Sequence, residues 1–290
     1  MGGAPVLRSE SRAHPVETRF AERALPDRRP ATLATAVAEA VDHVLTTTKG
    51  DVLAFLPGAG EINRCAALLR DRLDGAVAIL RLYADAPRDE QQAALTPAMT
   101  RRIVLTSAIA ETSLTVPGVR VVIDAGVARR NRFDPASGMS RLVTERASRA
   151  EADQRRGRAA REGPGLCIRL WTRGEHGALP AFAPPEIATA DLAPLALDLA
   201  AWGASPEALD FLTPPPEGQF AQAHALLGSL GLISAQGLIT PLGKQVVDLP
   251  LHPRLAVMVA TAGDDAPAAR LLAALLSEGD PERGGAADVT

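Results

Sequence analysis

Short apolar runs alternate with helical patterns between residues 51 and 125, and this alternation limits the possible folds more than any other feature of the chain. The apolar runs are Asp51–Pro57, Val77–Tyr83, Ile103–Ser107 and Val119–Ala125. Glu61–Leu73 and Arg88–Leu95 lie between the first three, and their apolar residues recur at helical spacing. Near-continuous apolar strands joined through helices are typical of a parallel sheet covered on both faces. The sequence therefore predicts an α/β fold, in which ligands gather at the carboxyl ends of the strands.

The flanking residues extend this lobe in both directions. Residues 1–29 are polar and punctuated by proline, which predicts a connector with one extended piece around Val16–Phe20. Asn131–Thr144 has the pattern of a hairpin with a longer turn. A last apolar run at Gly163–Trp171 predicts the strand that completes the lobe. We expect the lobe to occupy residues 30–175.

The character of the sequence changes after Trp171. Pro180–Pro185 reads as a linker, and short helical patterns follow it. Leu238–Ile239 predicts a small strand between two of these helices, as in a winged-helix module. We expect a small winged-helix-like module over residues 176–252, and the truncated start of a helical bundle over residues 253–290.

The composition excludes several classes of protein. The 290 residues carry a formal net charge of −3, which argues against a protein that coats nucleic acid through its overall charge. The two cysteines, Cys65 and Cys167, each lie in an apolar segment and are expected to be buried thiols in a reducing compartment. The scattered histidines predict no metal site. The chain has no signal-peptide pattern and no apolar run of membrane length, so we expect a cytoplasmic protein.

The densest basic segment is QRRGRAAR at residues 154–161. A capping box at Ser148–Glu151 predicts a helix that runs through Arg161, and this helix would place Gln154, Arg158 and Arg161 on one face. Two planar, permanently charged guanidinium groups that converge at the carboxyl edge of the sheet suit a phosphate. The residues alone leave a solvated basic helix face open as the alternative.

A second polar segment, TSAIAETSLT at residues 106–115, follows the third apolar run. Hydroxyl groups and exposed N–H groups at a strand-to-helix turn can bind the phosphates of a nucleic acid or orient a water molecule. An ordinary capped turn is the competing interpretation.

Two further glycine patterns are weak. Gly58-Ala59-Gly60 follows a strand but lacks the third glycine of a dinucleotide-binding loop. Gly243-Lys244 resembles the end of a phosphate-binding loop, but Gln245 stands where Ser or Thr is required. We expect this second pattern to be the start of a helix.

Together these segments resemble the motifs of DEAH-box ATP-dependent RNA helicases. FLPGAGEI at residues 55–62 is similar to motif IV of that family, TSAIAETSLT to motif V, and QRRGRAAR to motif VI. Other stretches are similar to the HrpB type, in the same order along nearly the whole chain: HPVETRF at 14–20, FDPASGMSRL at 133–142, PGLCIRLW at 164–171, PEIATADLAPLALDLAAWG at 185–203 and LPLHPRLAVM at 249–258.

The resemblance implies a RecA-like lobe, related in fold to P-loop NTPases but without a P-loop of its own. It implies that Arg158 and Arg161 act as arginine fingers on the β- and γ-phosphates of ATP with Mg²⁺, with Gln154 near the γ-phosphate. Ser113 would help to place the attacking water. Leu95 stands where the family often has an aromatic residue against adenine.

The resemblance also implies contacts to the backbone of single-stranded RNA from the motif IV and motif V turns. The residues at the matching positions are Thr106, Ser107, Thr112, Thr115, Gly58 and Gly60. Two positions depart from the family pattern: Ala160 replaces a glycine of motif VI, and Pro117 replaces an acidic residue that is often found near the ribose.

The sequence contains neither a G-x-x-x-x-G-K-[ST] loop nor an Asp-Glu-x-His motif. The family carries both on an N-terminal RecA-like lobe of the same polypeptide, so we expect half of an active site here and no ATP turnover by this chain alone. Two other interpretations stay open at this point. One is a non-catalytic nucleic-acid-binding or regulatory module, and the other is a doubly wound enzyme with a nucleotide cofactor.

Overall fold

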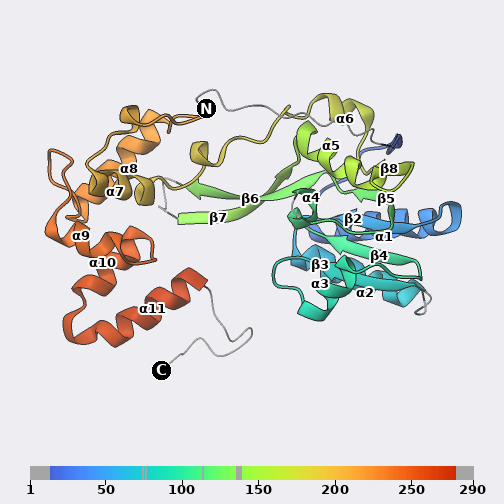
Figure 1. The fold of residues 1–290 in the computed structure, drawn as a ribbon, viewed down its shortest axis with the longest axis horizontal. Coiled ribbons are helices and arrows are strands. Elements are labelled where there is room, and N and C mark those ends of the chain that lie inside the picture. The colour runs from blue at the N-terminus through green and yellow to red at the C-terminus, as the bar shows by residue number, and fades with distance from the viewer. Residues whose placement is uncertain (1–13, 74, 76, 113, 135–138, 279–290) are drawn as a thin grey trace. The chain divides into compact units, whose positions relative to one another are not determined.

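The computed structural model describes residues 14–73, 75, 77–112, 114–134 and 139–278 (Figure 1). These residues form two compact units, each with its own core. The first unit comprises the described residues up to Arg130 together with Leu142–Ala183, and the second comprises Asn131–Arg141 and the described residues from Pro184 onward.

The first unit is built on a six-stranded sheet in the order β1-β8-β5-β2-β4-β3, so that β1 and β3 are its outer strands. All neighbouring strands run parallel. Their bounds are β1 Val16–Phe20, β2 Asp51–Phe55, β3 Ala78–Leu82, β4 Arg102–Thr106, β5 Val119–Asp124 and β8 Gly165–Arg169. The predicted α/β class with a parallel sheet is confirmed.

Helices cover both faces of this sheet, as the apolar runs predict. In β2, Val52 and Ala54 pack against α1 (Pro30–Thr47) and α2 (Ala59–Leu73). Leu53 and Phe55 point to the opposite face, against α3 (Arg88–Leu95) and α4 (Ile109–Thr112). Because successive side chains of a strand point to opposite faces, one short apolar strand supplies both cores.

Two boundaries of the first unit differ from the expected ones. Val16–Phe20, expected as part of a connector, is the outer strand β1 and pairs with β8. Past residue 175 the unit continues through α6 (Arg173–Gly177) to Ala183, because Glu175 of α6 is bound to Arg28 at 2.5 Å and to Arg146 at 2.9 Å.

The predicted hairpin is present as a two-stranded sheet of β6 (Val127–Asp134) and β7 (Met139–Arg146). Its described residues between Asn131 and Arg141 group with the second unit, and the expected longer turn between the strands lies outside the described residues. Within that unit the main chain of Phe133 donates a hydrogen bond to the Thr189 carbonyl at 3.1 Å.

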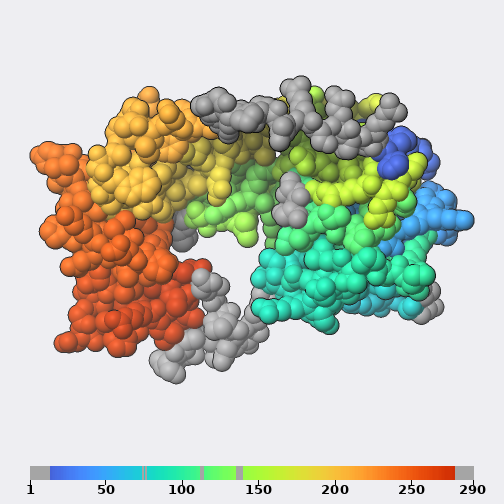
Figure 2. Space-filling view, viewed as in Figure 1, coloured from blue at the N-terminus to red at the C-terminus, as the bar shows by residue number. Residues whose placement is uncertain are grey.

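The second unit is helical. Its elements are η2 Glu186–Ala188, α7 Ala193–Trp202, η3 Pro206–Ala208, α8 Glu217–Ser229, α9 Pro241–Val247, α10 Pro253–Thr261, η4 Gly263–Asp265 and α11 Ala266–Glu278. Leu197, Leu227 and Leu232 lie at the centre of its core. The small strand expected at Leu238–Ile239 is a single antiparallel bridge between Ile233 and Ile239. α11 forms part of the molecular surface (Figure 2). In the described part of the chain, every helix is too short or too polar to cross a membrane.

Candidate nucleotide-facing and nucleic-acid-facing site

The basic segment at residues 154–161 forms the end of α5 (Arg149–Gly157) and the turn that follows it. α5 begins at the predicted capping box, in which the Ser148 hydroxyl accepts a hydrogen bond from the Glu151 N–H and the Glu151 carboxylate accepts one from the Ser148 N–H. The prediction of an α-helix through Arg161 is wrong, because α5 ends at Gly157 and continues as a 3-10 turn, η1 (Arg158–Ala160).

Close packing of β8 against η1 accompanies the tighter turn. A Cβ atom on Gly165, the first residue of β8, would lie 2.2 Å from the carbonyl oxygen of Ala159, so only glycine permits this approach. A 3-10 turn has about three residues per turn, and side chains three positions apart therefore point the same way. Arg158 and Arg161 consequently lie on one side of η1.

Both arginines contact the motif V segment. The Arg158 guanidinium donates to the carbonyl of Leu114 at 3.2 Å and to the carbonyl of Glu111, and Arg161 donates to the hydroxyl of Thr115. Among the described residues, no carboxylate forms an ion pair with either arginine. An arginine finger that reaches toward a second lobe is expected to be open to solvent. Arg161 is exposed, whereas Arg158 is only 7% exposed, so this expectation is wrong for Arg158.

The surroundings of Arg158 do not neutralise its charge. Burial, followed by the neighbouring charge of Arg161, lowers the pKa of Arg158, and the nearby carboxylate of Glu111 only partly opposes this. A lowered pKa means that the cationic form is poorly solvated where it lies.

Arg161 does not lie at the carboxyl edge of the sheet, where the sequence predicts it, whereas Arg158 is bound to the carbonyl of Glu111 in α4, the helix that follows the carboxyl end of β4. Glu162 accepts a hydrogen bond from the Gly118 N–H at 3.1 Å, and the Gly118 carbonyl accepts one from Asp51, the first residue of β2, at 3.0 Å. Glu162, which follows η1 and Arg161, therefore lies beside the amino ends of β2 and β5. Arg161 lies near those ends, with Arg158 one turn before it.

The motif V hydroxyl groups have different environments. Thr106 is fully buried and donates its hydroxyl to the Leu82 carbonyl at 2.8 Å, so it cannot contact a nucleic acid through that group. Ser107, immediately after β4, is half-buried. The Thr115 hydroxyl accepts from Arg161 and thus lies beside the arginines. Ser113 and the side chain of Thr112 lie outside the described residues.

The glycine turn after β2 is partly covered. A Cβ atom on Gly58 would lie 2.7 Å from Nη1 of Arg129, so this guanidinium covers the position that was expected to face RNA. Gly60, in the first turn of α2, is exposed and has no atom within 4 Å of its Cβ position. The Gly243-Lys244 pattern is the start of a helix, as expected, because the buried Gly243 lies in the first turn of α9.

Leu95 shares the sheet face that carries the arginines. It packs at the edge of the same core cluster as Leu114, whose carbonyl binds Arg158. A concave region of about 470 Å³ lies nearby, lined in part by Pro97, Pro117 and Glu162. Leu95, the concavity and Arg161 therefore lie in the same region of the first unit.

The sequence analysis missed the most deeply buried charge of this region. Arg155 is 1% exposed and donates to Glu111 at 3.1 Å, to Asp124 at 2.9 Å and to the Val127 carbonyl at 3.1 Å. Burial would lower the pKa of Arg155, but the charges of Asp124 and Glu111 outweigh it and raise the pKa. Burial raises the pKa of Glu111, and Arg155 opposes that shift.

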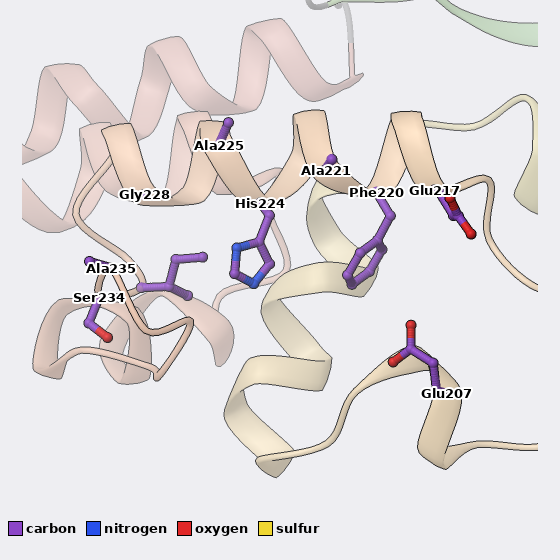
Figure 3. A pocket seen from close by; sticks show the side chains of 10 residues that line it. Glu207, Glu217, Phe220, Ala221, His224, Ala225, Gly228, Ser234 and Ala235 are labelled. Carbon is purple, nitrogen blue, oxygen red and sulfur yellow. The ribbon is translucent and has the colours of Figure 1, made fainter.

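A separate groove of about 540 Å³ lies in the second unit (Figure 3). Phe220 and His224 project from one side of α8, while Glu207 extends from η3 and Ser234 from the loop that follows α8. No predicted site residue lines it. Its size alone therefore does not make it the candidate site.

Comparison with known proteins agrees with this geometry. Residues 35–163 match the family described as the helicase conserved C-terminal domain. The chain is 38% identical to the ATP-dependent RNA helicase HrpB of Escherichia coli over 291 residues, which cover 99% of this chain and 35% of that protein. The chain therefore contains the conserved C-terminal domain of helicases and is similar over nearly its whole length to HrpB, a DEAH-box RNA helicase.

A solved structure and a second helicase are also similar to this chain. A crystal structure of the Escherichia coli DEAH/RHA helicase HrpB aligns with a TM-score of 0.88 and 37% identity, covering 98% of this chain and 36% of that one. The ATP-dependent RNA helicase HrpA of Escherichia coli is 37% identical over 88% of this chain and 20% of its own length. The chain thus spans little more than a third of HrpB, and its parallel sheet is the predicted RecA-like lobe.

Proposed function

We propose that this chain supplies the RNA-gripping and arginine-finger half of an ATP-dependent RNA helicase, and that it does not turn over ATP alone. The observation that carries the proposal is the placement of Arg158 and Arg161 on one side of η1 without an ion-pair partner among the described residues. Two guanidinium groups without counter-anions suit the phosphates of a nucleotide held by a second lobe. HrpB and HrpA are named as ATP-dependent RNA helicases, which supports this reaction class.

The residues present fit the phosphate end of ATP. Arg158 and Arg161 would bind phosphate oxygens and stabilise the negative charge that develops on the transferred group. Gln154 is exposed one helical turn before Arg158, and we assign it to the γ-phosphate or the attacking water, together with Ser113. We assign Leu95 to contact with the adenine.

ATP bound with Mg²⁺ would supply the phosphoanhydride bond whose cleavage drives the motor. The described residues contain no group of three acidic, histidine or cysteine side chains that could hold a metal ion. The sequence also lacks a P-loop. We therefore assign the Mg²⁺ ligands to an N-terminal RecA-like lobe of the same polypeptide.

We propose that single-stranded RNA contacts the carboxyl edge of the sheet. Ser107 follows β4 at that edge, and Gly60 lies in the first turn of α2, which follows β2. We also assign Thr112 to RNA contact. Thr106 is not assigned to it, because its buried hydroxyl is already bound to the Leu82 carbonyl. Hydroxyl and N–H groups favour backbone contacts, which carry little sequence information. We place the protein in the cytoplasm, where RNA is available to it.

Replacement of Arg158 by alanine tests the proposal in a polypeptide that joins this chain to a lobe carrying a P-loop. A finger of this kind is worth about 10³-fold or more in turnover. The matched control is Arg156→Ala, because Arg156 lies in the same segment, is about half exposed and pairs with Asp153 at 3.6 Å. A loss below about threefold for Arg158→Ala would instead favour a non-catalytic nucleic-acid-binding module.

A further inference from the structure

Glu111 is bound by two arginines of motif VI through two different groups. Its carboxylate accepts a hydrogen bond from Nε of Arg155 at 3.1 Å. Its main-chain carbonyl accepts one from the guanidinium of Arg158. The side chain of this one residue is therefore held by Arg155, while its main chain holds Arg158.

The helix that carries Glu111 is too short to fix this geometry alone. α4 spans only Ile109–Thr112, which is one turn. The first turn of a helix fixes several backbone dihedrals for a single hydrogen bond, and an isolated turn is therefore unstable. The direction in which the Glu111 carbonyl points thus depends on contacts from outside α4.

Arg155 provides such a contact because it is itself fixed on all sides. Its Nη1 donates to Asp124, the last residue of β5, and to the Val127 carbonyl, and its guanidinium lies 5.3 Å from the centre of the Phe55 ring. Both carboxylate partners are nearly inaccessible, with side-chain exposures of 11% for Glu111 and 0% for Asp124. The attraction between these charges is consequently weakly screened by solvent.

We infer that Glu111 is a positioning residue for Arg158, because Arg155 fixes its carboxylate while its main-chain carbonyl receives the Arg158 guanidinium. This inference rests on the proposed role of Arg158 as an arginine finger. Glu111 touches no phosphate in this arrangement and acts through Arg158. The motif V turn and the motif VI arginines would then approach a nucleotide as one preorganised unit, which limits reorganisation during the reaction.

A double-mutant cycle tests this in the polypeptide that joins the chain to a P-loop lobe. Glu111→Gln keeps the size and hydrogen-bonding capacity of the side chain but removes its charge. We expect kcat to fall by about tenfold or more while KM for ATP changes by less than about twofold, the signature of an interaction made in the transition state. In an Arg158→Ala background the same substitution should change kcat by less than about twofold, because the group that it positions is absent.

The matched control is Glu90→Gln, which removes the charge of a part-buried carboxylate paired with Arg81 at 2.9 Å in the same lobe. This control should leave kcat unchanged in both backgrounds. If Glu111→Gln lowers kcat equally in both backgrounds, the inference is overturned while the role of Arg158 stands. A loss below about threefold for Arg158→Ala would instead contradict the proposed function itself.

A measurement on the 290-residue chain keeps the test independent of turnover. In wild type, the bonds from Arg158 to two carbonyl groups should slow rotation of its guanidinium, which gives separate Nη signals in ¹⁵N NMR spectra. Glu111→Gln and Arg155→Lys should average these signals, since a lysine ammonium cannot reproduce the planar fork of arginine. Glu90→Gln should leave them separate. Separate Arg158 signals in folded Glu111→Gln protein would overturn the inference.

Discussion

Gly126 lies between β5 and β6, directly before β6, where both the backbone and the packing exclude a side chain. Its φ is +72°, and a Cβ atom would lie 2.6 Å from Cε3 of Trp171, whose side chain is 1% exposed. A left-handed φ costs an L-residue about 1–2 kcal/mol, and forcing a methyl group into a packed core costs about 1–3 kcal/mol. The smaller entropy of the unfolded alanine chain offsets about 0.4–1 kcal/mol. The middle of these ranges predicts that Gly126→Ala lowers the free energy of unfolding by about 3 kcal/mol.

Urea denaturation followed by tryptophan fluorescence measures this change, because Trp171 is buried while Trp202 is already 72% exposed. With a slope of about 2 kcal/mol per molar urea, the midpoint should fall by about 1–2 M. The control is Gly75→Ala, since Gly75 has a φ of +75° but no atom within 4 Å of its Cβ position. The control should lose only about 1 kcal/mol or less. Equal midpoints for the two variants would refute the argument that the Trp171 ring fills the space beside Gly126.

The purified chain should hydrolyse no more ATP than an Arg158→Ala preparation, because the ligands of the triphosphate and of Mg²⁺ are assigned to another lobe. ATP turnover that requires this chain and Mg²⁺ would contradict that assignment. Its binding to single-stranded RNA should be weak, with a logarithmic salt slope of about −0.7 per phosphate contacted and little sequence preference. Affinity that does not change with salt, or that is confined to one sequence, would argue against backbone contacts. Burial would raise the pKa of Glu175, but hydrogen bonds from the Thr172 N–H and from Arg146 and Arg28 outweigh it and lower the pKa to about 2. Stability from this group should therefore be present above about pH 4.5 and lost as the pH falls toward 2, and urea midpoints should show a smaller acid loss in Glu175→Gln than in wild type.

The strands could be predicted closely because their signal is local. Each apolar run in residues 51–125 matches its strand with ends that differ by no more than two residues, since a parallel strand buried on both faces needs an unbroken apolar sequence. The start of α5 was equally predictable, because the capping box Ser148–Glu151 spans a single turn. Signals of this kind depend only on neighbouring residues.

The features that could not be predicted depend on residues far apart in sequence. Val16 pairs with Gly165 across the sheet, so an edge strand looked like a connector. Thr106 lies near the end of an apolar run, where its hydroxyl looked available, but this hydroxyl donates to the Leu82 carbonyl of the neighbouring strand. Arg155 has partners 31 and 44 residues away, and nothing in the local pattern of motif VI distinguishes it from a solvated arginine.

The positions of β1 and β3 as outer strands also bear on how the lobe avoids aggregation. A free strand edge can pair with a strand of another molecule, and charged side chains on the edge discourage this. β1 presents Glu17 and Arg19, whose side chains are 62% and 51% exposed. At β3 the main-chain N–H of Arg81 donates to the carboxylate of Glu90 at 3.0 Å, so a donor that an added strand would need is already occupied. The exposed charges of β1 and the carboxylate bound to the backbone of β3 therefore both hinder the addition of a further strand to the sheet.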